Sequence, residues 1–267
     1  MADVTMRSGI FRDMRVLDLD LDFFMKDICF DADYDAPRLD DNIWLAQPID
    51  EMMAYLEQNL GLTGPLPGAV FEHHGDIFKQ WRRMINLGVL SKPFHLTHVD
   101  AHADLGLGDD IYHYLLNDIM SRDPRWRQEV LAGERHLTDG SFVAFAVACQ
   151  WISAIDYVHH PAGGYDIPMI LLEGFNPDAT AIQLARLSNQ ELEQLQRAEL
   201  TEMPVFTSNE PRVPLQTIPG PYYETDEPFD FMFLTRSPAY TSQLADPLFD
   251  TIKRAFIDER ALRSRGL

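Results

Sequence analysis

The segment VLDLDLDFF, residues 16–24, has an aspartate at every second position: Asp18, Asp20 and Asp22. A period of two predicts a β-strand. Aspartate is depleted in strands, and like charges on one strand face repel each other. Buried carboxylates need a cation or a proton nearby, so we expect Asp20 and Asp22, nearest the strand's carboxyl end, to bind metal. Asp18 is expected to support them or to be structural. The alternative is an edge strand whose aspartates face water.

A second acidic set lies in HVDAHADLG, residues 98–106, where Asp100, His102 and Asp104 alternate as an apolar strand gives way to a loop. Sites in open α/β sheets form at the carboxyl ends of strands. Carboxylates suit manganese and magnesium, and imidazole favours zinc, iron and nickel. Two carboxylates able to bridge indicate a two-metal centre, whereas the alternative is an ordinary polar loop.

The third set is VFEHHGD, residues 70–76, in which Glu72, His73 and His74 follow an apolar strand and precede a helix. Three strand ends that meet at one sheet edge would bring together one histidine, DxHxD and DxD. That ligand composition fills two adjacent metal sites.

The elements that must position these residues alternate between strand and helix, which predicts βαβ units and a mostly parallel sheet. Helices are expected at 48–61, 77–88 and 188–200, through much of 111–160, and from about 246. Strands are expected around the three motifs and at 154–160, 167–175 and 229–235. Residues 203–228, rich in Pro, Thr and Glu, are predicted to be an irregular excursion with room for two short strands. We expect one α/β domain over 1–267.

The net charge of −20 and pI near 4.6 argue against nucleic acid and anionic membranes as partners and favour a cationic ligand, although solubility alone would also explain them. The two cysteines have no CxxC spacing, and no signal-peptide pattern opens the chain, so a cytoplasmic location is expected. The apolar run at 142–155 is too short for a membrane span and predicts a buried helix.

Together, VFEHHGD, HVDAHADLG, VLDLDLDFF and FLTRSPAYT resemble the ureohydrolases (arginases and agmatinases), and more closely the arginase-like family that includes peptide arginases. Those enzymes convert arginine side chains within ribosomal peptides to ornithine. The resemblance implies a three-layer α/β/α arginase-deacetylase-like fold, two Mn²⁺ ions per chain and an arginine-containing precursor peptide as partner.

Carried over by motif, the resemblance implies metal ligands at six positions, with His74 matching the single histidine better than His73. One metal would be held by His74, Asp100, Asp104 and Asp20, and the other by Asp100, His102, Asp20 and Asp22. Asp100 and Asp20 would bridge the two metals, and Asp104 would also orient the attacking water and pass on its proton.

The chain departs from the arginase pattern because its DxD strand precedes DAHxD, which suggests a circular permutation. The glutamate that grips the guanidinium in arginases is not obvious. The corresponding strand offers Thr235, Arg236, Ser237 and Tyr240. We predict substrate contacts from Ser237, Tyr240 and Glu173, with Asp139 as an alternative to Glu173.

Arginases also use a histidine after DAHxD as a proton shuttle. His136 is the predicted shuttle here, and His113 is the alternative.

The sequence therefore predicts a dinuclear-manganese hydrolase that converts arginine residues of a ribosomally made precursor peptide to ornithine and releases urea. Two alternatives stay open: a ureohydrolase of free arginine or agmatine, and a metal-binding peptide-interaction module without turnover.

Overall fold

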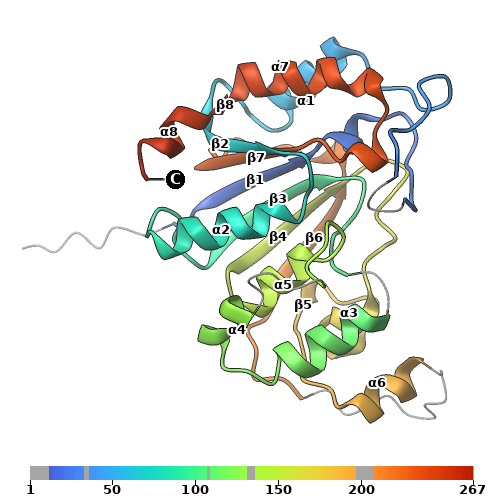
Figure 1. Cartoon of the computed structure of the whole chain (residues 1–267), viewed down its shortest axis with the longest axis vertical. Helices are drawn as coiled ribbons and strands as arrows, with labels where there is room; N and C mark the ends of the chain where they lie inside the picture. Colours follow the sequence, from blue (N-terminus) through green and yellow to red (C-terminus); the bar gives the residue numbers. More distant parts are fainter. Residues whose placement is uncertain (1–11, 33–35, 107–108, 131–135, 197–206, 267) are drawn as a thin grey trace, which may run out of the picture.

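The computed structural model describes residues 12–32, 36–106, 109–130, 136–196 and 207–266 (Figure 1). Its centre is an eight-stranded sheet in the order β5-β6-β4-β3-β1-β7-β2-β8. The strands are β1 Arg15–Asp20, β2 Leu66–Phe71, β3 Phe94–Asp100, β4 Ile152–His159, β5 Ala181–Ile182, β6 Val213–Pro219, β7 Phe231–Thr235 and β8 Ile257–Asp258. Neighbouring strands are parallel except β5 and β6, which are antiparallel. The predicted α/β class with a mostly parallel sheet is confirmed.

Helices cover both faces of the sheet and make a three-layer α/β/α arrangement (Figure 1). They are α1 Ile49–Gln58, α2 Asp76–Asn86, α3 Asp109–His113, α4 Pro124–Val130, α5 Phe142–Ala148, α6 Asn189–Gln196, α7 Asp246–Phe256 and α8 Glu259–Arg263. A π-helical turn, η2 Tyr114–Ile119, continues α3, and 3₁₀ turns include η1 Leu21–Phe24 directly after β1. None of the helices in the described ranges has both the length and the apolar character needed to cross a membrane.

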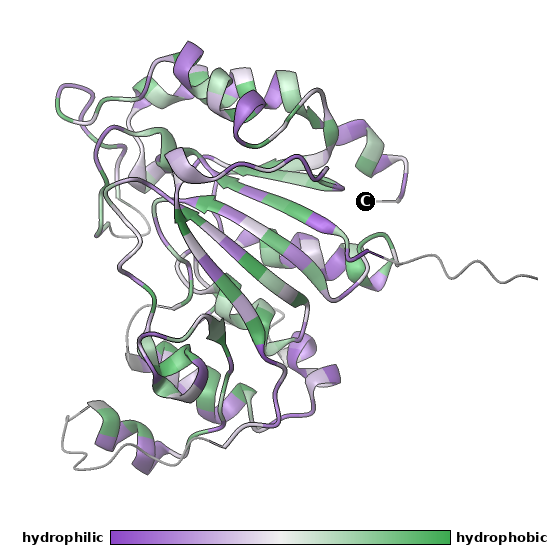
Figure 2. Ribbon diagram, turned by 180° about the vertical axis from the view of Figure 1, so that it is seen from behind, coloured by the Kyte–Doolittle hydropathy of each residue, from purple (hydrophilic) through white to green (hydrophobic). Residues whose placement is uncertain are grey.

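Two hydrophobic cores lie on opposite faces of the sheet because strand side chains alternate between faces. On one face, Leu17 and Leu19 of β1 pack with buried residues of α1 and α7. On the other, Val16 packs with buried residues of α2 and α5. Asp18 and Asp20 alternate with the two leucines and therefore share the face covered by α2 and α5. Figure 2 shows hydrophobic residues predominating in the strands, with hydrophilic bands between them.

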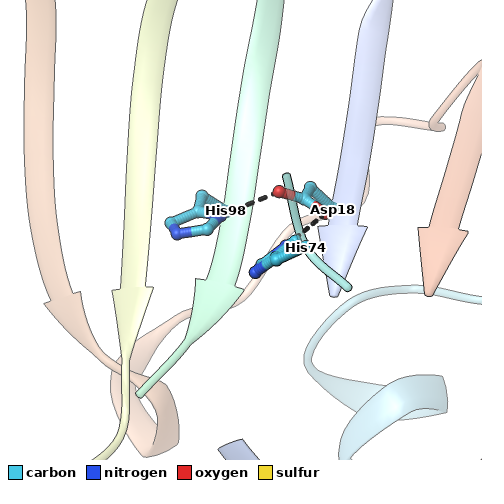
Figure 3. A group of neighbouring side chains, drawn as sticks. All are labelled: Asp18, His74 and His98. Carbon is cyan, nitrogen blue, oxygen red and sulfur yellow. Dashed lines mark hydrogen bonds and ion pairs between the residues drawn. The ribbon is translucent and has the colours of Figure 1, made fainter. Parts of the chain in front are cut away.

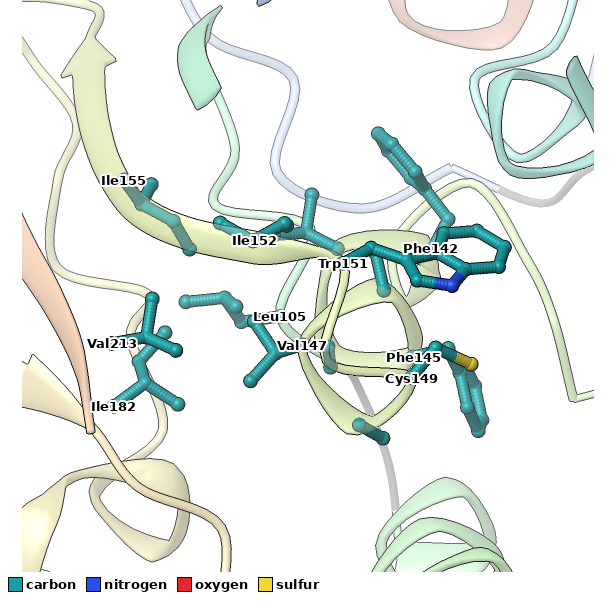
Figure 4. Close-up of a cluster of buried hydrophobic side chains, with 14 of the residues drawn as sticks. Leu105, Phe142, Phe145, Val147, Cys149, Trp151, Ile152, Ile155, Ile182 and Val213 are labelled. Carbon is teal, nitrogen blue, oxygen red and sulfur yellow. The ribbon is translucent and has the colours of Figure 1, made fainter. Parts of the chain in front are cut away.

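The core under α5 is packed by aromatic and branched side chains that join the helix to β4, β5 and β6 (Figure 4). The run 142–155, predicted to be one buried helix, is divided into two elements. The helix ends at Ala148, Gln150 adopts a φ of 57°, and β4 begins at Ile152. The run is buried as expected, but its second half is strand.

Two further predictions differ from the structure. Residues 167–175 are not a strand but two 3₁₀ turns, η3 Met169–Leu171 and η4 Glu173–Phe175, since Pro168 precedes the first turn and Gly174 has a φ of 67°. Within the predicted excursion, residues 213–219 form β6 inside the central sheet. The prolines of this segment suggested loop, yet Val213 and Leu215 alternate into the core. Residues 203–206 lie outside the described residues.

Candidate metal centre

The three motifs meet at the carboxyl ends of the central parallel strands. β1 and β3 are neighbours in register, with Asp18 opposite His98. Asp20 and Asp100 are the last residues of these strands. His74 reaches the same place from the turn between β2 and α2, across the intervening strand β7. The parallel topology thus gathers side chains that are far apart in sequence.

The ring nitrogen Nδ1 of His74 faces three carboxylate oxygens at once. It lies 2.9 Å from Asp20 Oδ2, 3.1 Å from Asp100 Oδ2 and 2.9 Å from Asp104 Oδ2. All four side chains are buried. One N–H can donate to only one of these oxygens at good geometry, so the arrangement exceeds what hydrogen bonding can satisfy.

Asp18 occupies the other side of the His74 ring and is itself fully buried (Figure 3). Its Oδ1 lies 3.0 Å from His74 Nε2, and its Oδ2 lies 2.9 Å from His98 Nδ1. A carboxylate that accepts the outer N–H of an imidazole leaves the inner nitrogen's lone pair for a cation, a common arrangement behind metal-binding histidines. Asp18 therefore takes the supporting position that the sequence predicted for it.

A second group forms beside the first, around His102. Its Nδ1 lies 3.0 Å from Asp22 Oδ2 and 3.6 Å from Asp100 Oδ1. Its Nε2 lies 3.0 Å from the backbone oxygen of Cys29, which fixes the ring from behind. Asp100 belongs to both groups, because Oδ2 faces His74 and Oδ1 faces His102. That is the placement of a bridging carboxylate.

Asp20 is held by hydrogen bonds on both oxygens. Oδ1 accepts the backbone N–H of Asp22 at 3.1 Å, which caps the η1 turn, and Oδ2 accepts the hydroxyl hydrogen of Ser237. The described contacts of Asp20 are with the His74 group, so its predicted bridging role stays a prediction.

The loop from Asp100 to Gly106 is anchored from several directions. Asp166 accepts the Ala103 N–H through Oδ2 at 2.6 Å and the Tyr157 hydroxyl through Oδ1 at 3.2 Å. Asp104 sits at a φ of 50°, a left-handed backbone conformation uncommon outside glycine. These contacts hold Asp104 in a strained conformation that turns its carboxylate into the cluster.

Burial raises the pKa of each of these carboxylates, and the neighbouring charges and hydrogen bonds decide the direction of the net shift. Burial, then the charge of Asp100, raises the pKa of Asp104 to about 7, and burial followed by Asp20 raises the pKa of Asp22 well above its usual value. Burial also raises the pKa of Asp100, but hydrogen bonds from His102 and His74 outweigh it, so this pKa lies below its usual value. The carboxylates compete for the available positive charge.

The surrounding carboxylates raise the pKa values of the imidazoles. Burial lowers the pKa of His98, but its hydrogen bond with Asp18 and the charge of Asp100 raise it to about 9 overall. Burial also lowers the pKa of His74, but the charges of Asp18 and Asp20 outweigh burial, so this pKa lies well above its ordinary value. The surrounding negative charge thus favours any cation at this point.

The donor set fits divalent metal ions. Oxygen ligands at about 2.1 Å in octahedral geometry stand about 3.0 Å apart along each edge, and the oxygens facing His74 Nδ1 lie 2.9–3.1 Å from it. Four groups of at least three ligand atoms could hold an ion: Asp18/His74/His98, Asp20/His74/Asp100, Asp22/Asp100/His102 and His98/Asp100/Asp104. Buried histidines and aspartates could therefore bind metal here.

The structure places the predicted site residues as follows. All six predicted ligands lie in the cluster, namely Asp20, Asp22, His74, Asp100, His102 and Asp104. Ser237 contacts Asp20, and the Tyr240 ring packs edge-on against His102 with centroids 5.0 Å apart. His73 is half-buried outside the cluster, with Nδ1 3.4 Å from Asp139 Oδ2. The choice of His74 over His73 agrees with this placement.

Three predicted residues lie elsewhere. Glu173 forms an ion pair with Arg212 at 2.8 Å beside the β5–β6 edge and lies outside the cluster, so its predicted substrate contact stays a prediction. His136 stacks on Tyr114, with centroids 4.4 Å apart, and not on the cluster. The alternative shuttle, His113, lies 3.4 Å from Asn189 on α6. Motif matching compares short stretches of sequence, so it could not predict how far these three residues lie from the cluster.

Two contributors were not predicted, His98 and Asp166. The signal for His98 was present, because it lies two residues before Asp100 and so shares its strand face. Asp166 had no local signal, since it reaches the loop from another segment.

Comparisons of this chain with protein-family models, with curated proteins and with solved structures each gave no match. The fold and the cluster define the chain as a three-layer α/β protein with a candidate metal centre at the carboxyl edge of its sheet.

Proposed function

We propose that this chain is a dinuclear-manganese hydrolase that converts arginine side chains in a ribosomally made precursor peptide to ornithine. The observation that carries the proposal is the pair of fused ligand groups, in which His74 Nδ1 faces three carboxylates and Asp100 also reaches His102. The peptide substrate rests on the resemblance of four sequence motifs and on the charge of −20, which suits a basic peptide.

The donor chemistry supports manganese. Four aspartates and two histidines make an oxygen-rich set, and carboxylates suit manganese and magnesium better than softer metals. The four carboxylates Asp20, Asp22, Asp100 and Asp104 would balance the charge of two divalent ions, so a cationic side chain could approach.

Two divalent ions, when bound, would lower the pKa of a shared water and supply hydroxide at neutral pH. The reaction adds water across the guanidinium carbon and breaks its bond to the side-chain nitrogen, so that urea leaves and ornithine remains. The leaving nitrogen needs a proton. Asp104 is the proposed carrier, because its carboxylate lies in the cluster beside Asp20, Asp100 and His74, where the shared water would bind.

Other residues keep this centre in one geometry. Asp18 holds the rings of His74 and His98, Ser237 holds Asp20, and the Cys29 carbonyl holds His102. We propose that Tyr240, packed on His102, forms part of the wall beside the substrate.

The test is to load the protein with Mn²⁺ and incubate it with a blocked synthetic peptide that contains one arginine, and separately with free arginine. We expect urea and a peptide mass reduced by the elements CN₂H₂. Asp100→Asn, which alters the carboxylate shared by both groups, should abolish the reaction. Urea from free arginine alone would exclude the peptide substrate. Metal binding without urea from either compound would leave an interaction module as the better interpretation.

A further inference from the structure

A cavity of about 500 Å³ opens beside the candidate metal centre. It is lined by the start of α2, by residues 137–140 before α5, and by residues 237–240 after β7. Two of these lining residues also touch the cluster: Ser237 donates to Asp20, and Tyr240 packs against His102. The cavity therefore adjoins the proposed reaction centre through Ser237 and Tyr240.

Asp139 is held in the cavity wall with a defined orientation. Its Oδ1 accepts the Gly75 backbone N–H at 2.8 Å, and its Oδ2 lies 3.4 Å from His73 Nδ1. The side chain stays 22% exposed, enough to meet a ligand. A Cβ at residue 75 would stand 3.2 Å from Asp139 Oδ1 and 3.0 Å from the Thr138 backbone, so glycine permits this close approach.

The other charged groups of the lining are already paired. Asp76 and Lys79 form an ion pair at 2.7 Å. Among the described residues that line the cavity, Asp139 is the carboxylate that no lysine or arginine contacts. It is oriented, accessible and not neutralised by a fixed side-chain cation, which are the properties of a recognition site for a cationic group.

We propose that Asp139 selects the guanidinium of an arginine side chain in this cavity. The inference rests on the proposed function for the identity of the substrate. Asp139 is a specificity-determining residue here, and it takes the place for which Glu173 was predicted.

The test compares two blocked amino acids of nearly equal shape, N-acetylarginine methylamide and its neutral ureido counterpart N-acetylcitrulline methylamide. Calorimetry on the Mn²⁺-loaded protein gives the Kd of each, or the KM where urea is released. We expect the wild-type protein to prefer the arginine compound and Asp139→Asn to lose about 10-fold or more of that preference, as for a lost charge-assisted hydrogen bond. The Asn side chain retains an acceptor for the Gly75 N–H.

The matched control is Asp76→Asn, which removes a carboxylate of the same cavity lining that is already paired with Lys79. We expect this variant to change the preference for the arginine compound by about twofold or less, because exposed ion pairs contribute little. Manganese content, measured by mass spectrometry, should equal that of the wild type in both variants. Retained preference in Asp139→Asn, or no preference in the wild type, overturns the inference even if urea is released. Preference that depends on Asp139 without any urea release keeps the inference and overturns the proposed hydrolase.

Discussion

At the scale of residues, the candidate metal centre has more carboxylate oxygens around His74 than the N–H groups of this histidine can satisfy. Three oxygens surround His74 Nδ1, while Asp18 lies against Nε2. His73, the next residue back, has the same chemistry but a half-exposed position against Asp139. The two adjacent histidines therefore provide a matched pair for an experiment.

We predict that His74→Ala lowers Mn²⁺ affinity by more than about 100-fold, since even residues behind metal ligands typically cost 10–100-fold. His73→Ala should retain the wild-type manganese content. Metal analysis after gel filtration, with far-UV circular dichroism to verify folding, measures the difference. Equal metal content in the two variants would remove His74 from the proposed ligand set.

The sequence predicted the ligand residues because their signals are local: alternation in the first strand, a histidine at the turn after the second strand, and DxHxD at the end of the third. It could not predict the contacts that depend on register. The pairing of Asp18 with His98 exists because β1 and β3 are neighbours in one register, and sequence periodicity does not report which strands are adjacent. For the same reason, the sequence could not decide whether Asp139 or Glu173 lies nearer the cluster.

At the scale of elements, a buried ion pair joins α4 to the segment before β6. Arg127, only 2% exposed, donates to both carboxylate oxygens of Glu210, at 2.7 and 2.9 Å. Gln150, between α5 and β4, donates to Glu210 as well. Burial raises the pKa of Glu210, but the Arg127 and Gln150 hydrogen bonds lower it below its ordinary value of 4.5.

A lowered folded-state pKa means that the stabilisation is fully present above pH 4.5 and is lost as pH falls through the folded-state value. We predict that Glu210→Gln lowers the free energy of unfolding at pH 7 by about 1.5–3 kcal/mol, the range for a hydrogen bond to a charged group. The difference from wild type should shrink as the pH falls below 4.5 and through the lowered folded-state pKa, beneath which both chains carry a neutral group here. Urea unfolding at several pH values measures it.

The control is Glu129→Gln, an exposed position on the same helix, where a change within about 0.5 kcal/mol is expected at every pH. A pH-independent cost for Glu210→Gln would contradict the ionic role.

Element prediction was best where hydrophobic periodicity was uninterrupted, as in α2 and α7, and was least specific where prolines interrupted it. β6 has prolines at 214 and 219 and lies in the predicted irregular excursion, for which two short strands were allowed but no place in the central sheet was predicted. Pro219 is the last residue of the strand, and Pro214 lies near its start, opposite Ala181 of the two-residue strand β5. Both prolines therefore lie near the ends of β6, where proline disrupts a sheet least. In contrast, the apolar residues of 167–175 suggested a strand, but this segment forms two 3₁₀ turns at the margin of the sheet.

At the scale of the whole molecule, the chain carries a net charge of −20, and part of its negative charge lies in the buried cluster. Any ligand that binds only the folded state raises stability by mass action. Divalent cations should therefore stabilise this chain well beyond the effect of ionic strength.

We predict that Mn²⁺ at about 100 times its Kd adds about 2.7 kcal/mol per site to the free energy of unfolding, which corresponds to a rise in Tm of several degrees. Differential scanning calorimetry measures it, with potassium chloride at equal ionic strength as the control for screening of surface charge. Excess EDTA should reverse the shift. A manganese effect no larger than that of potassium would contradict a specific site.

Ser237 has a consequence for engineering the chain. It adopts a left-handed φ of 45°, where glycine would relax the backbone, yet its hydroxyl is the group that holds Asp20. Selection for thermal stability alone would favour glycine at 237, and selection for a well-ordered metal ligand would favour serine. Stability and activity are therefore opposed at this one position, and a library sorted only for heat resistance would lose the serine first.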